Sequence, residues 1–367
     1  MTSRIAPAAG VAPLALALAA VLGVSSLAGE TAGHRAPQRL ADTGLYQSGR
    51  PGVIDPRNRA FAPQYPLWSD GASKARWIYL PPGERIDATD ATEWDFPVGT
   101  RFWKEFAFGG RKVETRMLWR ASEAGWIAAS YIWNADGTDA ILAPPEGVPG
   151  LTEIAAGRRH SVPSTADCAA CHGSPQLRPL GFTALQLSTD RDPHAIHGEP
   201  LAPEMITLAT LVSEGLLSPR RTDLIANPPR IATSNPQARA VLGYMVANCG
   251  SCHGRAGEVA AVEPFFQERE LLEDGNAVAR ALVGRVTRWM APGQKSPTLL
   301  LDPGDPDASA ILMRMRSRRP SSQMPPLGTV VRDDDAVEAL ARWMESEIRI
   351  PSAGGRGASG PAPSHAP

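Results

Sequence analysis

Polar and apolar side chains partly alternate through the stretch between Leu45 and Ala140. Such alternation is typical of strands that have one face in a core and the other in water. Turns that contain glycine, at 109–110 and 136–137, separate the runs. We therefore predict a β-rich sandwich or barrel-like module over 36–150, with strands at Arg76–Leu80, Phe102–Phe108, Lys112–Trp119 and Trp126–Trp133.

The apolar pattern changes to helical spacing later in the chain. It predicts helices over 206–217, over Pro236–Asn248 and over Asp333–Ile348. Gly243 is expected to let the second of these approach the last one closely, so that Trp343 packs against it. The expected fold class is multidomain: the β-rich N-terminal module is followed by two mainly α domains, over 155–229 and 231–350, and by a disordered tail over 351–367.

The N-terminus has the pattern of a secretory signal peptide. Residues 1–29 hold a lone basic Arg4, an apolar run from Val11 to Val24 and small residues before Glu30. The apolar run is shorter than the ~20 residues of a membrane span. We expect cleavage and a periplasmic mature chain without a transmembrane span; an uncleaved N-terminal anchor is the alternative.

The composition limits the expected number of domains and the classes of partner, but it does not identify the protein. The 367 residues exceed what one core usually organises, so two or three domains are expected. A formal net charge of −1 gives no global bias toward nucleic acid, so no nucleic-acid partner is predicted. Most of the nine tryptophans lie in the β-rich module, where they either pack the core or form a sugar-stacking or partner-binding surface; core packing is the favoured interpretation.

All four cysteines belong to two copies of one pattern, Cys-x-x-Cys-His. The first copy holds Cys168, Cys171 and His172, and the second holds Cys249, Cys252 and His253. In covalent haem attachment the two thiols bond the haem vinyl groups and the histidine supplies the proximal ligand to iron. A thioredoxin-like couple or zinc site is the competing interpretation, but neither explains a histidine after both pairs. We predict two covalently bound haem c groups.

A sixth ligand to iron is predicted for each haem. Met324 stands before two prolines in a loop and is the candidate for the second haem, ahead of the other methionines of that segment, Met290, Met313 and Met315. Met205 ranks first for the first haem, but His194 and His197 compete with it. An iron without a sixth protein ligand is the remaining alternative.

With these residues in hand, the second half of the chain resembles tandem di-haem members of the cytochrome c family. The resemblance rests on the two Cys-x-x-Cys-His motifs and on the Met324-Pro325-Pro326 loop. The preceding part, with its segments 65–72, 96–100 and 113–116, looks like the N-terminal module of a group of bacterial periplasmic di-haem cytochromes. Some relatives in that group are joined to sugar-dehydrogenase-like domains, which implies a redox partner such as a periplasmic dehydrogenase, and a terminal acceptor.

The expected function is single-electron transfer between a redox enzyme and an acceptor. One rival is a peroxidase-like di-haem enzyme with an open first haem, whose proton donor would be sought among His160, Glu199 and Glu204. Another is a sugar-binding or partner-binding module with a haem relay. The arginines before Met324 either form a basic docking patch or are a solvated helix end; they are Arg314, Arg316, Arg318 and Arg319.

Overall fold

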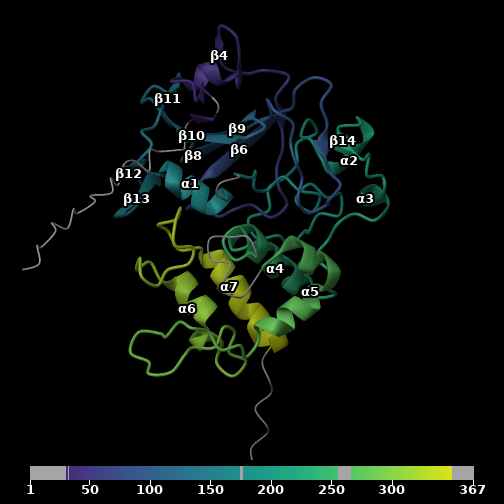
Figure 1. The fold of residues 1–367 in the computed structure, drawn as a ribbon. Coiled ribbons are helices and arrows are strands. Elements are labelled where there is room, and N and C mark those ends of the chain that lie inside the picture. Colours follow the sequence, from purple (N-terminus) through teal and green to yellow (C-terminus); the bar gives the residue numbers. More distant parts are fainter. Residues whose placement is uncertain (1–29, 32, 174–176, 255–265, 349–367) are drawn as a thin grey trace, which may run out of the picture.

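The structure is a computed structural model that describes residues 30–31, 33–173, 177–254 and 266–348 (Figure 1). The predicted signal peptide and the predicted tail lie outside the described residues. The strands gather in one half of the molecule and the helices α4 to α7 in the other, with α1 between them.

A six-stranded antiparallel sheet organises the strand-rich half, in the order β11-β10-β9-β8-β6-β5. The four strands predicted from alternation are confirmed and form its centre: β6 (Ser73–Tyr79), β8 (Arg101–Phe108), β9 (Arg111–Ser122) and β10 (Gly125–Trp133). The short strands β5 (Arg59–Ala60) and β11 (Ala140–Leu142) are its edges. Gly109 and Gly110 turn β8 into β9 with φ of 55° and 79°, values that favour glycine. The sheet is open, and is neither a sandwich nor a barrel.

Each face of this sheet is covered by a different part of the chain. Trp103, Met117 and Tyr131 on one face pack with Leu40 and Leu45 from the N-terminal segment. Ile78, Phe102 and Trp126 on the other face pack with apolar residues that follow the first Cys-x-x-Cys-His motif, among them Phe182, Leu187, Ile206 and Leu211. Most of the tryptophans thus contribute to these cores, as the favoured interpretation predicted.

Short elements surround the sheet. They are β1 (Glu30–Thr31), β2 (His34–Arg35), the 3-10 helix η1 (Leu40–Thr43), β3 (Tyr46–Gln47), β4 (Arg50–Ile54), β7 (Ile86–Asp87) and β14 (Leu217–Ser218). Strand β14 pairs with β7 in parallel, which ties the segment after the first motif to the strand-rich half. The hairpin of β12 (Val148–Ala155) and β13 (Arg158–Val162) leads into α1 (Thr165–His172).

The C-terminal part is helical. Its elements are α4 (Pro236–Asn248), α5 (Glu268–Leu282), the 3-10 helix η2 (Pro306–Ala308), α6 (Ala310–Arg316), α7 (Asp334–Trp343) and the π-helical turn η3 (Met344–Ile348). The bounds predicted for α4 are confirmed, because Asn235 caps its first turn by accepting hydrogen bonds from the N–H groups of Gln237 and Ala238, and Pro236 fits the first helical position. Helices α4 and α7 share one core that includes Leu242, Leu340 and Trp343.

The predicted fold class is wrong in one main respect: the chain does not contain two mainly α domains. Among the described residues of the segment over 155–229, the only helices are α1 and two short ones, α2 (Leu208–Ser213) and α3 (Asp223–Ala226), and the segment also holds β13 and β14. The helix predicted over 206–217 shrinks to α2. The physical reason is that the apolar residues of this segment bury themselves against the sheet rather than against other helices.

Gly243 has a different role from the one predicted. A Cβ atom there would lie 2.1 Å from Cε1 of Tyr65, so the glycine admits the tyrosine ring rather than the terminal helix. Tyr65 is buried, and its hydroxyl donates to Asp192 Oδ2 at 3.2 Å. The segment that precedes β6 and contains Tyr65 therefore packs closely against α4.

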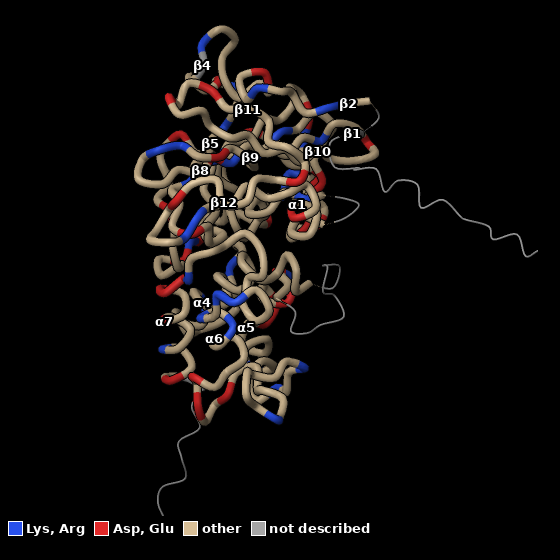
Figure 2. Tube along the Cα trace, turned by 90° about the vertical axis from the view of Figure 1, so that its left-hand side faces the viewer, with Lys and Arg blue, Asp and Glu red and all other residues tan. Residues whose placement is uncertain are grey.

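Charged residues of both signs are spread over both halves (Figure 2). This agrees with the formal net charge of −1. Within the described ranges, no helix combines the length and the apolar character needed to cross a bilayer.

Candidate functional site

The first Cys-x-x-Cys-His motif lies on α1, a helix of two turns. Ser164 and Asp167 form a reciprocal cap at its start: the Ser164 hydroxyl accepts from the Asp167 N–H at 3.1 Å, and the Asp167 carboxylate accepts from the Ser164 N–H at 2.9 Å. Because residues three apart share one helix face, Cys168 and Cys171 lie on the same side of α1. Gly173, with φ of 94°, ends the helix directly after His172.

The imidazole of His172 is held in one orientation by the backbone. Its Nδ1 lies 2.6 Å from the carbonyl oxygen of Arg178, which can only accept, so Nδ1 carries the proton. Burial, with smaller effects from Lys104 and Arg116, lowers the pKa of His172 to about 4. The ring is therefore neutral at pH 7, and the lone pair on Nε2 is available to a metal.

The second motif follows α4 directly. Cys249 is the C-terminal cap of the helix, and a tight turn brings the N–H of His253 to 2.8 Å from the Cys249 carbonyl oxygen. Gly250 fits this turn because an added Cβ would lie 2.5 Å from the Phe266 carbonyl oxygen. Phe266 in turn donates its N–H to the His253 carbonyl oxygen at 2.9 Å and places its ring 6.4 Å from the imidazole.

The fold brings the two motifs into contact. The Cys252 thiol donates to the carbonyl oxygen of Ala170, which lies between the cysteines of the first motif, at 3.7 Å. The pKa of the Cys171 thiol is raised above its usual range, most strongly by a hydrogen bond with Cys252 and less strongly by burial. None of the four cysteines is in a disulfide. The sequence predicted each motif but contained no signal that they meet, since 82 residues separate Cys252 from Ala170.

A cavity of about 520 Å³ lies beside the second motif, near the turn from β9 into β10. Gly250 and Ser251 of the second motif line it, together with the segment 177–183 that follows the first. Its aromatic walls are Trp94, Phe96, Trp126, Phe182 and Phe266. Charged side chains line it as well, among them Glu93, Asp95, Arg120 and Arg178, so the cavity combines aromatic and polar surface.

Glu268 lines the same cavity and was not identified from the sequence. Burial raises the pKa of its carboxyl group to about 8. Thr183 Oγ1 donates to its Oε2 at 2.9 Å. At pH 7 this carboxyl group is therefore mostly protonated and can give up a proton inside the cavity.

A buried ion-pair cluster lies on the sheet beside the first motif. Glu114 is fully buried. Its two carboxylate oxygens accept from Arg116 at 2.7 and 2.9 Å, and its Oε2 also lies 2.9 Å from His160 Nε2. Arg116 and His160 hold the pKa of Glu114 at about 2 despite its burial. The cluster uses His160, one of the proton donors considered for a haem enzyme. Of the other two proton donors considered, Glu199 forms an ion pair with Arg76 and Glu204 is exposed.

The Met324 loop is anchored by the arginines that precede it. The Arg314 carbonyl oxygen accepts a hydrogen bond from the Met324 N–H at 3.0 Å. The Arg318 side chain donates to Thr329 Oγ1 at 3.1 Å and to the Met324 carbonyl oxygen at 3.4 Å. Arg316 pairs with Asp307 at 2.7 Å. Arg314 and Arg318 thus support the loop, whereas Arg316 pairs outside it, and the docking-patch interpretation of the four arginines stays a prediction.

The loop is also fastened to the segment before β6. Asp70 Oδ1 accepts from the N–H groups of Val330 and Val331 at 2.9 and 2.8 Å, and the Trp68 indole donates to the Val331 carbonyl oxygen. Met324 itself is half-buried. Its ligation of iron stays a prediction.

The candidate ligands of the first haem have different surroundings. Met205 is half-buried beside the edge strand β5, where the next residue, Ile206, donates its N–H to the Ala60 carbonyl oxygen. His197 Nε2 binds Asp333 at 2.8 Å and its ring stacks on Trp68, while His194 is exposed. His197 thus has a structural partner already, and the assignment of Met205 stays a prediction.

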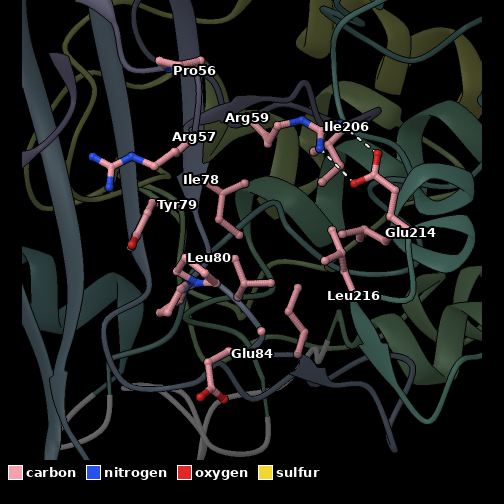
Figure 3. A pocket seen from close by; sticks show the side chains of 15 residues that line it. Pro56, Arg57, Arg59, Ile78, Tyr79, Leu80, Glu84, Ile206, Glu214 and Leu216 are labelled. Carbon is pink, nitrogen blue, oxygen red and sulfur yellow. Dashed lines mark hydrogen bonds and ion pairs between the residues drawn. The ribbon is translucent and has the colours of Figure 1, made fainter. Parts of the chain in front are cut away.

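A second cavity, of about 310 Å³, lies beside β5, one of the two edge strands of the sheet (Figure 3). Arg59 and Glu214 meet across it at 2.9 Å, above a floor that includes Ile78 and Leu216. Neither motif contributes to it.

Comparison with known proteins adds no relative, because no family model, curated protein or solved structure matches the chain.

Proposed function

We propose that this chain is a periplasmic di-haem c-type cytochrome that passes single electrons between a redox enzyme and an acceptor. The observation that carries the proposal is the contact between the two Cys-x-x-Cys-His motifs, through Cys252 and Ala170. Two attachment sites side by side favour electron exchange within one chain, because exchange requires redox centres that are close together.

The residues of both motifs fit a covalently attached haem. The four cysteines are not in disulfides and can form thioether bonds, and the neutral imidazole of His172 has Nε2 available for iron. The cavity beside the second motif offers aromatic walls together with charged groups. When bound, haem iron supplies a one-electron ferric–ferrous couple.

The protein's own residues orient and tune the site. The Arg178 carbonyl oxygen fixes the plane of the His172 ring and increases the basicity of Nε2. Cys168 and Cys171 lie on one capped helix, which sets their relative position for the first attachment site. The anchored loop offers Met324, whose thioether would raise the potential of the second iron.

Glu268 favours a second function, in which a small ligand reacts at one iron. A protonated carboxyl group in the cavity beside the second motif is the kind of proton donor that a peroxidase-like site requires. A spectrum of the purified protein, recorded during a redox titration, separates the two functions. Two low-spin irons that do not bind added peroxide or carbon monoxide support electron transfer alone. A high-spin iron that binds either ligand favours the enzyme.

A further inference from the structure

One loop of the strand-rich half reaches the start of the second Cys-x-x-Cys-His motif. This loop, the clamp segment (66–70), precedes β6. The Trp68 N–H donates to Asn248 Oδ1 at 2.7 Å, and Asn248 Nδ2 donates to the Pro66 carbonyl oxygen at 3.4 Å. Asn248 is buried, is the last residue of α4 and directly precedes Cys249. The clamp segment thus holds the end of the helix at which the second motif begins.

The same segment holds the far end of the Met324 loop. Asp70 Oδ1 accepts from the N–H groups of Val330 and Val331, at 2.9 and 2.8 Å. The Trp68 indole donates to the Val331 carbonyl oxygen at 3.2 Å. The near end of the loop, at Met324, is fastened within the helical part itself. The far end is therefore held from the strand-rich half.

Trp68 also reaches the start of α7. Its ring stacks on the imidazole of His197, with the ring centroids 4.8 Å apart. His197 Nε2 lies 2.8 Å from Oδ1 of Asp333, the residue that caps α7 by accepting the Ala336 N–H. The end of α4, the Met324 loop and the start of α7 thus all depend on one segment.

The backbone of the clamp segment is suited to a short list of residues at position 70. Asp70 has a φ of 57°, and Gly71 follows with 77°. The Ala72 N–H donates to the Ser69 carbonyl oxygen at 3.0 Å, which closes the turn. Asparagine and glycine adopt such a positive φ more readily than other residues do. These two replacements therefore keep the turn, and they separate the effect of the Asp70 carboxylate from that of the backbone.

We propose that the clamp segment sets the reduction potential of the haem at the second motif, with Asp70 and Trp68 as positioning residues. The inference rests on the proposed function, since it requires haem attached at the second motif. That motif supplies His253 and the loop supplies Met324, the two ligands expected for one iron. Because the clamp segment binds both the start of the motif and the loop, it fixes one relative to the other. A methionine that is held in place stabilises the reduced iron and raises its potential.

The proposal gives the strand-rich half a part in the second haem site. The contacts from Trp68 and Asp70 to the helical half join residues that are between 180 and 263 positions apart along the chain. The helical half therefore does not complete its own haem site.

The test compares Asp70→Gly with Asp302→Gly in the haem-loaded protein. Asp302 is the matched control because its Oδ1 also accepts from two backbone N–H groups, those of Gly304 and Asp305, but within one turn of the helical half. Asp70→Gly should lower the potential of one haem in a redox titration and weaken the methionine-to-iron absorption band. Asp302→Gly should change neither. Asp70→Asn should keep the wild-type values, because its amide oxygen can accept the same hydrogen bonds.

Two further variants assign the effect and protect the test against a misfolded protein. With the first motif blocked by Cys168→Ser and Cys171→Ser, Asp70→Gly should still lower the potential, and a shift that disappears in this chain would overturn the inference. Trp68→Phe removes the indole donor but keeps an aromatic ring, so it should lower the same potential by a smaller amount. If Asp70→Gly does not fold, Trp68→Phe decides, and an unchanged potential counts against the inference.

A separate measurement follows the contact itself. Amide hydrogen exchange at Val330 and Val331 should be faster in Asp70→Gly than in the wild type, because the acceptor of their N–H groups is lost. Equal potentials for Asp70→Gly and Asp302→Gly in a protein with both haems would overturn the inference alone, whatever the exchange rates. A protein without covalent haem would overturn the proposed function instead.

Discussion

The thiol of Cys252 donates a hydrogen bond to the carbonyl oxygen of Ala170, and this contact joins the second Cys-x-x-Cys-His motif to the first. The sheet positions the first motif through α1, and the helical part positions the second at the end of α4. The two attachment sites therefore meet where the two halves of the molecule pack together.

The buried carboxylate of Glu114 should make the protein sensitive to acid. Its pKa is held at about 2 in the folded chain, against 4.5 for an ordinary glutamate. Its stabilising effect is complete above pH 4.5 and is lost as the pH falls toward 2. Glu114→Gln should cost about 3–5 kcal/mol at pH 7, because Arg116 loses its buried partner. Denaturant unfolding at pH 7 and pH 3 checks this, with the exposed Glu84→Gln as control. An equal loss at both pH values would contradict it.

Glu268 should have the opposite pH dependence. Its pKa is raised to about 8 in the folded state, so the unfolded chain loses the proton first and stability falls as the pH rises from 4.5 to 8. The slope is at most about 1.4 kcal/mol per pH unit. Glu268→Gln should remove this slope, whereas Glu273→Gln, an exposed change on α5, should keep it. Unfolding curves at several pH values measure the difference, and an unchanged slope in Glu268→Gln rules out the assigned burial.

The sheet was predictable because its signals are local. Alternation along Lys112–Trp119 and the glycines at 109 and 110 define β9 and its turn without reference to the rest of the chain. The segment over 155–229 was not predictable in the same way. The local sequence does not indicate whether its apolar residues, such as Phe182 and Leu187, pack on helices or on a sheet, because tertiary contacts determine this.

Gly243→Ala should destabilise the protein through Tyr65. The added methyl group would overlap the tyrosine ring, and overpacking of this kind costs about 1–3 kcal/mol. Combining it with Tyr65→Ala should give a double variant that is less destabilised than the sum of the two single changes. Thermal unfolding of the three variants provides the measurement. Additive effects would show that the two residues do not constrain each other.

Met324→Ala tests the predicted ligand of the second iron. Loss of the thioether should remove the weak methionine-to-iron absorption band and lower the potential of one haem. Met290→Ala is the control, since that side chain is 55% exposed in the same part of the chain. If both variants keep the wild-type absorption spectrum, Met324 does not ligate iron.

The site itself was predictable only in its chemistry. Cys168, Cys171, Cys249 and Cys252 stand in motifs that can be read directly. The hydrogen bond from His172 to Arg178, the cavity lined by Glu268 and the contact of Cys252 with Ala170 all depend on segments that are distant along the chain or joined by loops. Such contacts leave no periodic or compositional trace.

The most direct test of the account is the number of haem groups bound covalently to each chain. The full chain should be produced in a periplasm that has cytochrome c maturation, and its intact mass and pyridine haemochrome content measured. We predict two haems per chain, one after Cys168→Ser with Cys171→Ser, and one after Cys249→Ser with Cys252→Ser. An intact mass without covalent haem would contradict the account.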